Sequence, residues 1–286
     1  MSGVLVMKVG GATLEDPVAS PKLLDAIAGL SRRQSVVLVH GGGRAVDRQL
    51  AKLGMETRRH EGLRITPPDQ IEQIAGVLAG SENKRVVGEL LCRGVRAVGM
   101  CLGDGGAVRT RKMGPVGNAV DLGAVDLGNV GEVATSPDLG AADNLLRVLC
   151  GAGFVPVVCS IGIEALPRDA GAGGSRLLNV NADDAAAGAA RAIKASGGAV
   201  DALVLLTDVP GVLDATKRRI ESLDAAGIER LVREGVVSGG MLVKVRAAHA
   251  TATALGTPVV IASGTDQASL DGLSNAAPLG TRILPG

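Results

Sequence analysis

The stretch Ser35-Val-Val-Leu-Val-His40-Gly-Gly-Gly43-Arg-Ala-Val-Asp-Arg-Gln-Leu50 decides the fold. Its consecutive apolar residues, mostly valine, predict a strand that is buried on both faces. Glycines follow, and apolar side chains then return at helical spacing over Arg44–Leu53. Such a strand–glycine–helix unit presents backbone N–H groups to an anion at a helix N-terminus. The spacing matches neither GxxxxGK[ST] nor GxGxxG, and a glycine turn also serves as a plain connection.

The composition excludes several classes of partner. The chain of 286 residues carries 30 Lys and Arg against 29 Asp and Glu, so its net charge gives no reason to expect nucleic acid or an acidic membrane. One Phe, no Tyr and no Trp provide no aromatic surface for stacking bases. A bound adenine therefore has to rest on aliphatic side chains and backbone. No apolar run approaches the ~20 residues that span a bilayer.

The cysteines and the N-terminus indicate a reduced, cytoplasmic protein. The four cysteines form no CxxC pair and have no histidine at metal-ligand spacing, so we predict no metal site built from them. Strand-like sequence begins at Val4, which leaves no room for a signal peptide.

A second glycine turn follows the predicted strand Gly3–Val9. Lys8 lies inside this apolar run, and Gly10 and Gly11 come directly after it. A lysine there is costly to bury unless an anion meets it. Alternatively, its stem follows an edge strand and its ammonium reaches water. Because two glycines follow at once, we favour an ammonium directed at a phosphate.

Two further stretches carry polar groups suited to an anionic ligand. Arg64 is a forked donor that fits a carboxylate, although a lone arginine is more often a surface residue. Asn179, Asn181 and Asp183 recur at a spacing of two, before an Ala-rich helix that ends near Ala195. Since only one of them can cap that helix, we expect a polar face turned toward a ligand.

The last third of the chain repeats the strand-then-glycine theme. A strand from Asp201 breaks at Thr207 into the turn Asp208–Leu213, and ligands of open α/β sheets bind at such carboxyl ends. Gly235–Gly240 is another glycine turn that leads into a helix. Lys244 falls one turn into this helix, where the helix dipole disfavours a cation unless an anion binds there.

The remaining pattern predicts further helices, strands and loops. We expect Ser20 to cap a helix over Pro21–Arg33, and we expect β-hairpins within Gly103–Val133 to overhang the site as a lid. The loop Glu164–Ser175 is expected to join the two halves. The other predicted helices are Asp69–Ala79, Ser81–Leu91, Asp138–Leu149 and Ser222–Arg233, and the other predicted strands are Val95–Leu102, Phe154–Ser160, Thr257–Ile261 and Thr281–Leu284.

These features favour one kind of chemistry. The sequence offers no Ser–His–Asp arrangement, no CxxC and no HExxH, so it provides no candidate nucleophile. Phosphoryl transfer asks a protein for positioning and charge neutralisation rather than covalent chemistry. The residues alone therefore predict a phosphate-handling α/β enzyme that is not a P-loop protein.

The same motifs resemble the amino-acid kinase family, and within it the N-acetylglutamate kinases. The resemblance covers essentially the whole chain, in order, and six motifs in register are specific. They are Lys8-Val-Gly-Gly11, His40-Gly-Gly-Gly43, Gly62-Leu-Arg-Ile-Thr66, Asn179-Val-Asn-Ala-Asp183, Thr207-Asp-Val-Pro-Gly211 and Gly240-Met-Leu-Val-Lys244, with support from Ala79–Lys84, Leu102–Gly105 and Gly280–Leu284.

The resemblance implies a fold and a reaction. The fold is α/β, a three-layer αβα sandwich around a mainly parallel open sheet. Residues 1–175 form a lobe for acetylglutamate binding and dimerisation, and residues 176–286 form a lobe for ATP. The enzyme transfers the γ-phosphate of ATP, with Mg²⁺, to the side-chain carboxylate of N-acetyl-L-glutamate, the second step of arginine synthesis. A homodimer is implied.

The resemblance also implies roles for individual residues. Lys8 and Lys244 flank the transferring phosphoryl group, and Asp183 holds both lysines. Arg64, Asn179 and Asn181 grip the acetylglutamate carboxylate. Backbone N–H groups of Gly10, Gly11, Gly42 and Gly43 bind the moving oxygens, and the nucleotide is lined by Asp208, Val209, Pro210, Gly211, Val212, Leu213, Val236, Val237 and Ser238.

Three departures from the family pattern limit this transfer. The loop Ala165–Leu178 is long and rich in glycine, so motion between the halves can differ. The near-absence of aromatic residues leaves adenine packing unpredicted. The chain also begins at its first strand, without the N-terminal helix that links dimers into hexamers in arginine-inhibited relatives. We therefore expect a dimer that is insensitive to arginine.

Other functions fit the sequence less well. A sister kinase that phosphorylates aminoadipate on a carrier protein has a different glycine turn and arginine motif from His40–Gly43 and Gly62–Thr66. Aspartate kinase and glutamate 5-kinase would need an appendage after residue 286. A non-catalytic ligand sensor would not need Lys8, Lys244 and Asp183 together.

Overall fold

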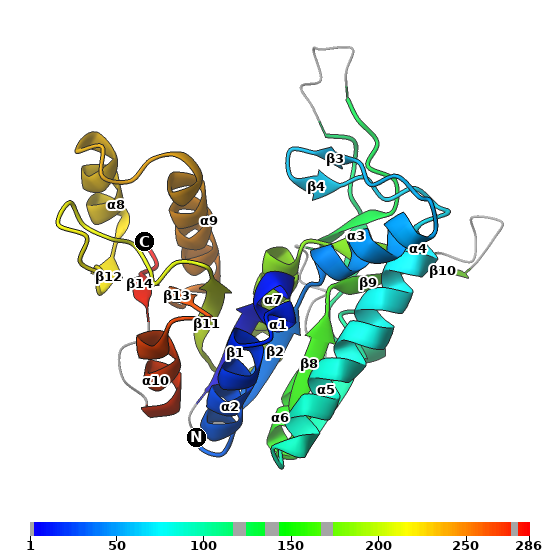
Figure 1. The fold of residues 1–286 in the computed structure, drawn as a ribbon, viewed down its shortest axis with the longest axis horizontal. Coiled ribbons are helices and arrows are strands. Elements are labelled where there is room, and N and C mark those ends of the chain that lie inside the picture. Colours follow the sequence, from blue (N-terminus) through cyan, green and yellow to red (C-terminus); the bar gives the residue numbers. More distant parts are fainter. Residues whose placement is uncertain (1–2, 117–123, 135–142, 167–173, 276–279) are drawn as a thin grey trace.

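An eight-stranded sheet forms the centre of the molecule (Figure 1). The computed structural model describes residues 3–116, 124–134, 143–166, 174–275 and 280–286. In spatial order the strands are β12 (Ser222–Leu223), β14 (Thr281–Ile283), β13 (Val259–Ser263), β11 (Val200–Thr207), β1 (Val4–Val9), β2 (Val36–His40), β8 (Val155–Cys159) and β5 (Ala97–Cys101). Neighbours pair in parallel except β13 and β14, which confirms the mainly parallel sheet.

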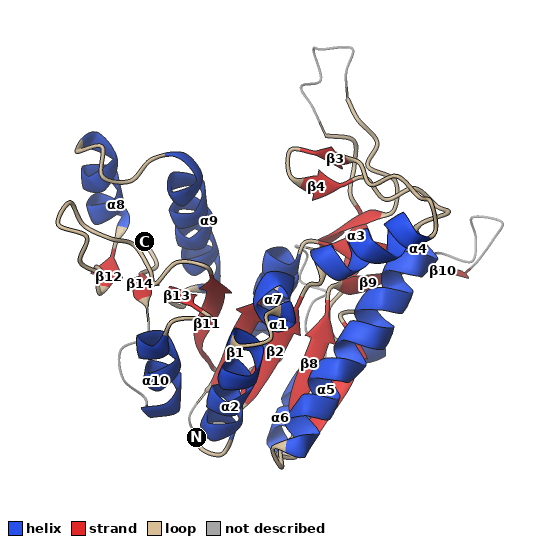
Figure 2. Ribbon diagram, in the orientation of Figure 1, coloured by secondary structure: helices blue, strands red, loops and turns tan. Residues whose placement is uncertain are grey.

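Helices cover both faces of this sheet, as Figure 2 shows. Strand residues alternate between the faces: Met7 and Val9 pack on one side and Val4 and Val6 on the other. The first face is covered by α1 (Gly11–Glu15), α2 (Ala19–Ser31), α5 (Asn83–Cys92) and α10 (Gln267–Asn275), and the second by α6 (Leu145–Gly151), α7 (Ala182–Ala195), α8 (Ala225–Arg233) and α9 (Gly239–Leu255). The predicted three-layer α/β fold is confirmed.

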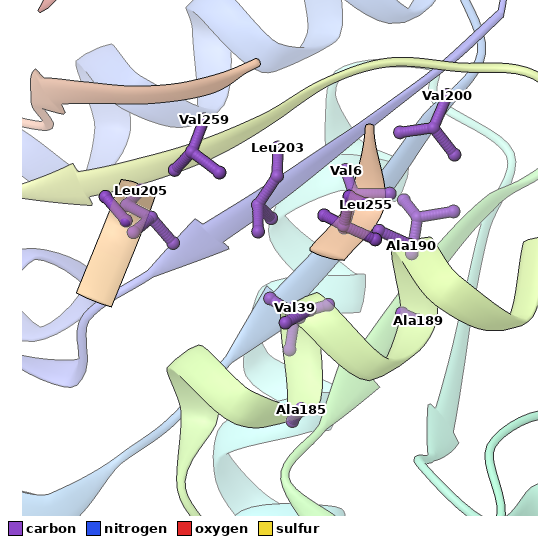
Figure 3. Close-up of a cluster of buried hydrophobic side chains, with 14 of the residues drawn as sticks. Val6, Val39, Ala185, Ala189, Ala190, Val200, Leu203, Leu205, Leu255 and Val259 are labelled. Atoms are coloured by element: carbon purple, nitrogen blue, oxygen red, sulfur yellow. The ribbon is translucent and has the colours of Figure 1, made fainter. Parts of the chain in front are cut away.

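Helix α7 presents alanine side chains to the sheet where it crosses the sheet centre. Ala185, Ala189 and Ala190 are fully buried and face Val6 and Val39 of the two central strands (Figure 3). Because alanine is small and the best helix former, α7 packs close to the sheet without aromatic filler. Its N-terminus thereby comes to lie near the end of β1.

A second, smaller sheet extends beyond the carboxyl ends of β2 and β8. Its order is β6 (Thr110–Lys112), β7 (Val130–Val133), β10 (Gly174–Val180) and β9 (Ile161–Leu166), and a separate hairpin joins β3 (Arg59–His60) to β4 (Leu63–Arg64). The antiparallel pairing of β6 with β7 confirms a hairpin within Gly103–Val133. Residues 117–123 of the expected lid lie outside the described residues.

One helical run extends from the central sheet to this smaller sheet and includes a change of helix type. It consists of α4 (Ile71–Ala75), the π-helix η1 (Gly76–Glu82) and α5. The predicted helices Asp69–Ala79 and Ser81–Leu91 are thus one continuous segment. Together with α3 (Gly43–Lys52), this run packs on Cys159 and Ile161 in a small apolar cluster of its own. A π-helical turn carries an extra residue and is frequent at functional sites.

Several predicted boundaries are wrong for identifiable reasons. Ser20 does not cap α2: it is buried inside the helix, while the Asp16 carboxylate accepts the N–H groups of Val18 and Ala19. These backbone donors hold the pKa of Asp16 below its ordinary value. Helix α8 begins at Ala225 because Asp224 caps it, so Ser222 and Leu223 are free to form β12.

Two other predictions are corrected in part. The expected loop Glu164–Ser175 is strand at both ends, because β9 and β10 pair antiparallel from Leu166–Gly174 to Ile161–Asn179. Of the expected helix Asp138–Leu149, residues 138–142 lie outside the described residues, and the rest begins at Leu145, since the Asn144 side chain caps it. Helix α1, helix α10 and the short 3₁₀ turn η2 (Asp104–Gly106) are not in the sequence prediction.

Candidate active site

Two glycine turns meet at the carboxyl edge of the central sheet. Because β1 and β2 are neighbouring parallel strands, Gly10–Gly11 and Gly41–Gly43 emerge side by side. A Cβ added to Gly11 would lie 2.8 Å from the Cα of Gly42, and one added to Gly42 would lie 2.9 Å from Leu78 Cδ2 of η1. Both turns therefore need glycine for close approach rather than for an unusual φ angle.

A pocket of about 220 Å³ opens beside the second turn. Its walls come from the β2–α3 turn, from Arg64 of β4, from η1 and from the β10–α7 junction. The predicted substrate residues Gly42, Gly43, Arg64, Asn179 and Asn181 all line it. The sequence motifs from 62 to 66 and from 179 to 183, more than a hundred residues apart, are thus brought to one cavity.

Arg64 is held firmly in the wall of this pocket. Its side chain is only 6% exposed, and Nη1 lies 2.6 Å from Asp47 Oδ1. Its other nitrogen, Nη2, donates to the Gly43 carbonyl at 3.1 Å. Burial alone would raise the pKa of Asp47, but the hydrogen bond and charge of Arg64 hold it below its ordinary value. The guanidinium is therefore fixed in orientation, as recognition of a carboxylate requires.

The two asparagines of the pocket play different structural parts. Asn179, in β10, donates to Thr66 Oγ1 at 3.1 Å, and Thr66 in turn donates to the Arg64 carbonyl at 3.0 Å. Asn181 is the N-cap of α7, where its side chain accepts the Asp183 N–H at 2.8 Å. Ordinary capping, which the sequence left open, therefore applies to Asn181, whereas Asn179 links two walls of the pocket.

Lys8 and Asp183 form an ion pair at the end of β1. Lys8 shares the sheet face of Val4 and Val6, on which α7 packs, so its ammonium meets the first turn of α7. The Lys8 Nζ lies 3.0 Å from Asp183 Oδ1, with the two side chains 17% and 56% exposed. Burial, and then the neighbouring charge of Asp183, raise the pKa of Asp184. The pair places both signs of charge next to the glycine turns.

The structure does not bring the second lysine to Asp183. The Lys244 Nζ lies 3.7 Å from Asp208 Oδ1, and the Asp208 side chain is 91% exposed. The expectation that Asp183 holds both lysines is therefore met for Lys8 alone. Lys244 projects from α9 toward the turn after β11, on the other half of the sheet.

The residues expected around the nucleotide lie on two loops of the second half. Helix α9 starts after Ser238, whose side chain makes no capping hydrogen bond. Val212 and Val237 are buried in the core, so their side chains are not free to contact a ligand. Gly211 has φ 141°, and Thr281 lies against it. Of the expected set, Asp208, Pro210 and Ser238 are exposed, while Val209, Leu213 and Val236 are partly buried.

The sequence analysis missed two polar side chains of the pocket. Arg59 lines it and lies 3.2 Å from Asp47 Oδ2, so one carboxylate serves two guanidinium groups. Ser160, directly after β8, also lines it. The carboxylate that joins the arginines, Asp47, lies one turn after Gly43 in α3. An acidic residue on a helix face does not by itself predict a binding site, and no spacing rule connects Asp47 to the arginines.

Among the described residues, no group of three or more His, Cys, Asp or Glu side chains is placed to hold a metal ion. None of the helices in the described part of the chain combines the length and the apolar character needed to cross a membrane.

The amino-acid sequence of this chain is similar to that of one known protein family. Residues 3–263 match the model of the amino acid kinase family. The acetylglutamate kinase of Shewanella oneidensis is 41% identical over 289 residues, covering 99% of this chain and 98% of that protein. The acetylglutamate kinase of Pectobacterium carotovorum is 39% identical over 286 residues, covering 98% of both chains.

A solved structure shares the fold at lower identity. The N-acetylglutamate synthase of Neisseria gonorrhoeae, in complex with coenzyme A and L-arginine, superposes with a TM-score of 0.70 and 22% identity. The match covers 99% of this chain and 62% of the synthase chain, so the chain spans less than two thirds of that protein.

Proposed function

Because this chain belongs to the amino acid kinase family, we propose that it phosphorylates N-acetyl-L-glutamate. The side-chain carboxylate attacks the γ-phosphorus of ATP, the bond to the ADP oxygen breaks, and N-acetyl-L-glutamyl 5-phosphate and ADP leave. The observation that carries this proposal is the pocket in which a fixed Arg64 faces the glycine turn, with the Lys8–Asp183 pair at the same sheet edge.

The pocket supports recognition of a dicarboxylic acid at one end. Arg64 presents a positive charge to the substrate's backbone carboxylate, and Asn179 and Asn181 add polar groups on the facing wall. The side-chain carboxylate then reaches the glycine turns, where Gly10, Gly11, Gly42 and Gly43 offer backbone N–H groups.

Charge neutralisation falls to the two lysines. Lys8 is placed to offset charge on the transferring phosphoryl group, and Asp183 orients its ammonium. Lys244 is proposed to approach the same group from the second half of the molecule, leaving its exposed partner Asp208.

ATP, bound with Mg²⁺, supplies the phosphoryl group and an electrophilic phosphorus. The chain fits this pairing: α9 begins without a side-chain cap, and Lys244 lies within that helix. Since no described cluster of acidic side chains holds a metal alone, Mg²⁺ is expected to be held mainly by phosphate oxygens. The division into an acetylglutamate lobe (1–175) and an ATP lobe (176–286), and the homodimer, remain predictions.

An acylphosphate assay tests the function directly. The purified protein is incubated with Mg-ATP and one of four acids (N-acetylglutamate, glutamate, aspartate or aminoadipate), and the product is trapped with hydroxylamine. We expect signal with N-acetylglutamate alone. No signal with any acid, despite ATP binding, would contradict the proposal and favour a carrier-bound substrate or a sensor.

A pair of arginine variants ties the activity to the pocket. Arg64→Lys keeps the charge but loses the fork, so we expect the KM for N-acetylglutamate to rise at least about tenfold. Arg58→Lys is the matched control, because Arg58 is exposed and pairs only with Glu56 among the described residues. An unchanged KM in Arg64→Lys would remove Arg64 from substrate binding.

A further inference from the structure

His40 is a buried titratable residue that the proposed mechanism does not use. It ends β2, directly before the glycine turn, and it is fully buried. Its Nδ1 lies 3.0 Å from the Gly41 carbonyl, and its Nε2 lies 3.0 Å from Nδ2 of Asn83, which is also fully buried. Burial lowers the pKa of the imidazole, so the ring is neutral near pH 7.

The surrounding hydrogen bonds fix which ring nitrogen carries the proton. The Asn83 Nδ2 also donates to the Val157 carbonyl at 2.9 Å, and Asn83 Oδ1 accepts from Lys84 Nζ at 3.2 Å. The Asn83 amide is therefore oriented with its nitrogen toward His40, and an amide nitrogen can only donate. Nε2 of His40 consequently accepts, and Nδ1–H donates to the Gly41 carbonyl.

The π-helix brings Asn83 to this place. Asn83 is the first residue after η1, whose extra residue shifts the following side chains around the helix axis. The same segment places Leu78 and Glu82 against Gly42. One irregular turn thus supports both the glycine turn and the histidine before it.

Holding the Gly41 carbonyl also sets the direction of the next N–H group. A peptide unit is planar and trans, so the N–H of Gly42 points away from the Gly41 carbonyl and its His40 partner. Gly42 is buried and lines the pocket, and its N–H has no hydrogen-bond acceptor among the described residues. Buried backbone donors are nearly always paired, so this one calls for an acceptor on a ligand.

We propose that His40 and Asn83 are positioning residues that direct the Gly42 N–H at an oxygen of the group transferred in the pocket. This inference rests on the proposed function. Neither side chain touches the substrate: Asn83 fixes the ring tautomer, the ring fixes the Gly41 peptide, and that peptide presents the donor. The pair acts on the transition state, because it aims a donor rather than binding a substrate.

Two isosteric replacements separate this role from simple packing. In His40→Asn, the amide nitrogen takes the position of Nδ1 and can donate to the Gly41 carbonyl. In His40→Gln, the amide oxygen takes the position of Nε2 and accepts from Asn83, so the Gly41 contact is lost. We expect His40→Gln to lower kcat ~10²-fold, as loss of one such donor does elsewhere. His40→Asn should stay within about fivefold of wild type, and both KM values within about twofold in each variant.

The ring tautomer provides a readout that needs no activity. In ¹⁵N-labelled wild-type protein near pH 7, His40 should show a neutral imidazole protonated at Nδ1. The chain has three histidines, so His60→Gln and His249→Gln assign the signals. Asn83→Leu removes the donor to Nε2, and both the tautomer signal and kcat should change.

Each outcome decides something. A wild-type ring protonated at Nε2, full turnover in His40→Gln, or equal losses in both His40 variants would overturn the positioning role. Failure of His40→Gln to fold leaves the tautomer and Asn83→Leu to decide. A wild-type protein that is inactive on all four acids would contradict the proposed function instead, while the tautomer still reports on the pair.

Discussion

The two halves of the central sheet hold their lysines very differently. Lys8, in the first half, is mostly buried and pairs with Asp183 at 3.0 Å beside two glycine turns in contact. Lys244, in the second half, is 3.7 Å from the nearly fully exposed Asp208. Charges that are partly buried and closely paired keep one geometry, whereas exposed pairs are weak and exchange easily. The ion pair of the first half is therefore already formed in the structure without ligands, and we propose that the second half rearranges its charges when a nucleotide binds.

The largest expected effect is a fall in kcat when Lys8, in the first half of the sheet, is replaced. Lys8→Arg places a longer, planar cation where a compact ammonium sits, so we expect kcat to fall ~10²–10³-fold. The affinity for N-acetylglutamate, measured by calorimetry, should change less than about twofold, because Arg64 rather than Lys8 is proposed to hold the backbone carboxylate. Lys22→Arg, at an exposed position of α2, is the control. If turnover survives in Lys8→Arg, the assignment of Lys8 is wrong.

The next largest effect is a difference in kcat between variants of the two carboxylates that pair with Lys8 and Lys244. Asp183→Asn removes the charged partner that lies 3.0 Å from the Lys8 ammonium. Because a misplaced catalytic group loses rate steeply, we expect kcat to fall ~10–100-fold. Asp208→Asn breaks an exposed pair, so kcat should change less than about threefold. Steady-state kinetics of both variants at saturating substrates decide the matter. Equal losses would mean that the two halves are equally prebuilt.

Alanine substitutions in the glycine turns compare the two halves by their free energy of unfolding, which we expect to fall in the first half and to rise in the second. Gly11→Ala puts a Cβ against the Gly42 backbone, so we expect the free energy of unfolding to fall by ~1–3 kcal/mol. Gly240→Ala, in the first turn of α9, meets no atom within 4 Å and should raise it by ~0.4–1 kcal/mol. Gly10→Ala, also in open space, is the control beside Gly11. Urea unfolding gives all three values, and a destabilised Gly240→Ala would show that the second turn is also tightly packed.

The smallest expected effect is the pH dependence of the pocket wall. The pKa of Asp47 is lower in the folded than in the unfolded state, so its contribution to stability is present above the unfolded pKa, ~3.9. That contribution is lost as the pH falls through the folded pKa. Because Asp47 is partly exposed, Asp47→Asn should cost less than ~1 kcal/mol at pH 7, and less still near pH 3. A difference between the two proteins that grows on acidification would contradict this sign.

The sequence predicts the centre of the fold well because the signal there is local. Apolar runs that end in glycine are typical of buried strands with open turns, and this holds for Val4–Val9 and Val36–His40, while Val200–Thr207 runs into the turn Asp208–Leu213. The pocket residues Arg64 and Asn179 were also predictable, but their convergence came from a family pattern rather than from spacing. Their meeting depends on the parallel order of the strands, which no local pattern encodes.

The parts that escaped prediction depend on contacts between distant segments. Ser20 and Asp16 are both residue types that cap helices well. Because Ser20 is buried within α2, it is Asp16 that accepts the N–H groups at the start of the helix. The contact between Asn83 and His40 joins residues 43 positions apart across a π-helix, whose sequence carries no distinctive mark. The partner of Lys244 depends on the placement of α9 against the turn after β11, so sequence alone could not exclude Asp183.

The central position of β1 also has a consequence for how this chain is made. Residues 4–9 are synthesised well before residues 200–207, yet one edge of β1 pairs with β11, which ends at Thr207. Until that residue has been synthesised, β1 presents a valine-rich strand edge that lacks its partner β11. Closing a loop of this length is slow, and open strand edges promote association between nascent chains. The edge of β1 is therefore open to such association until β11 has been made.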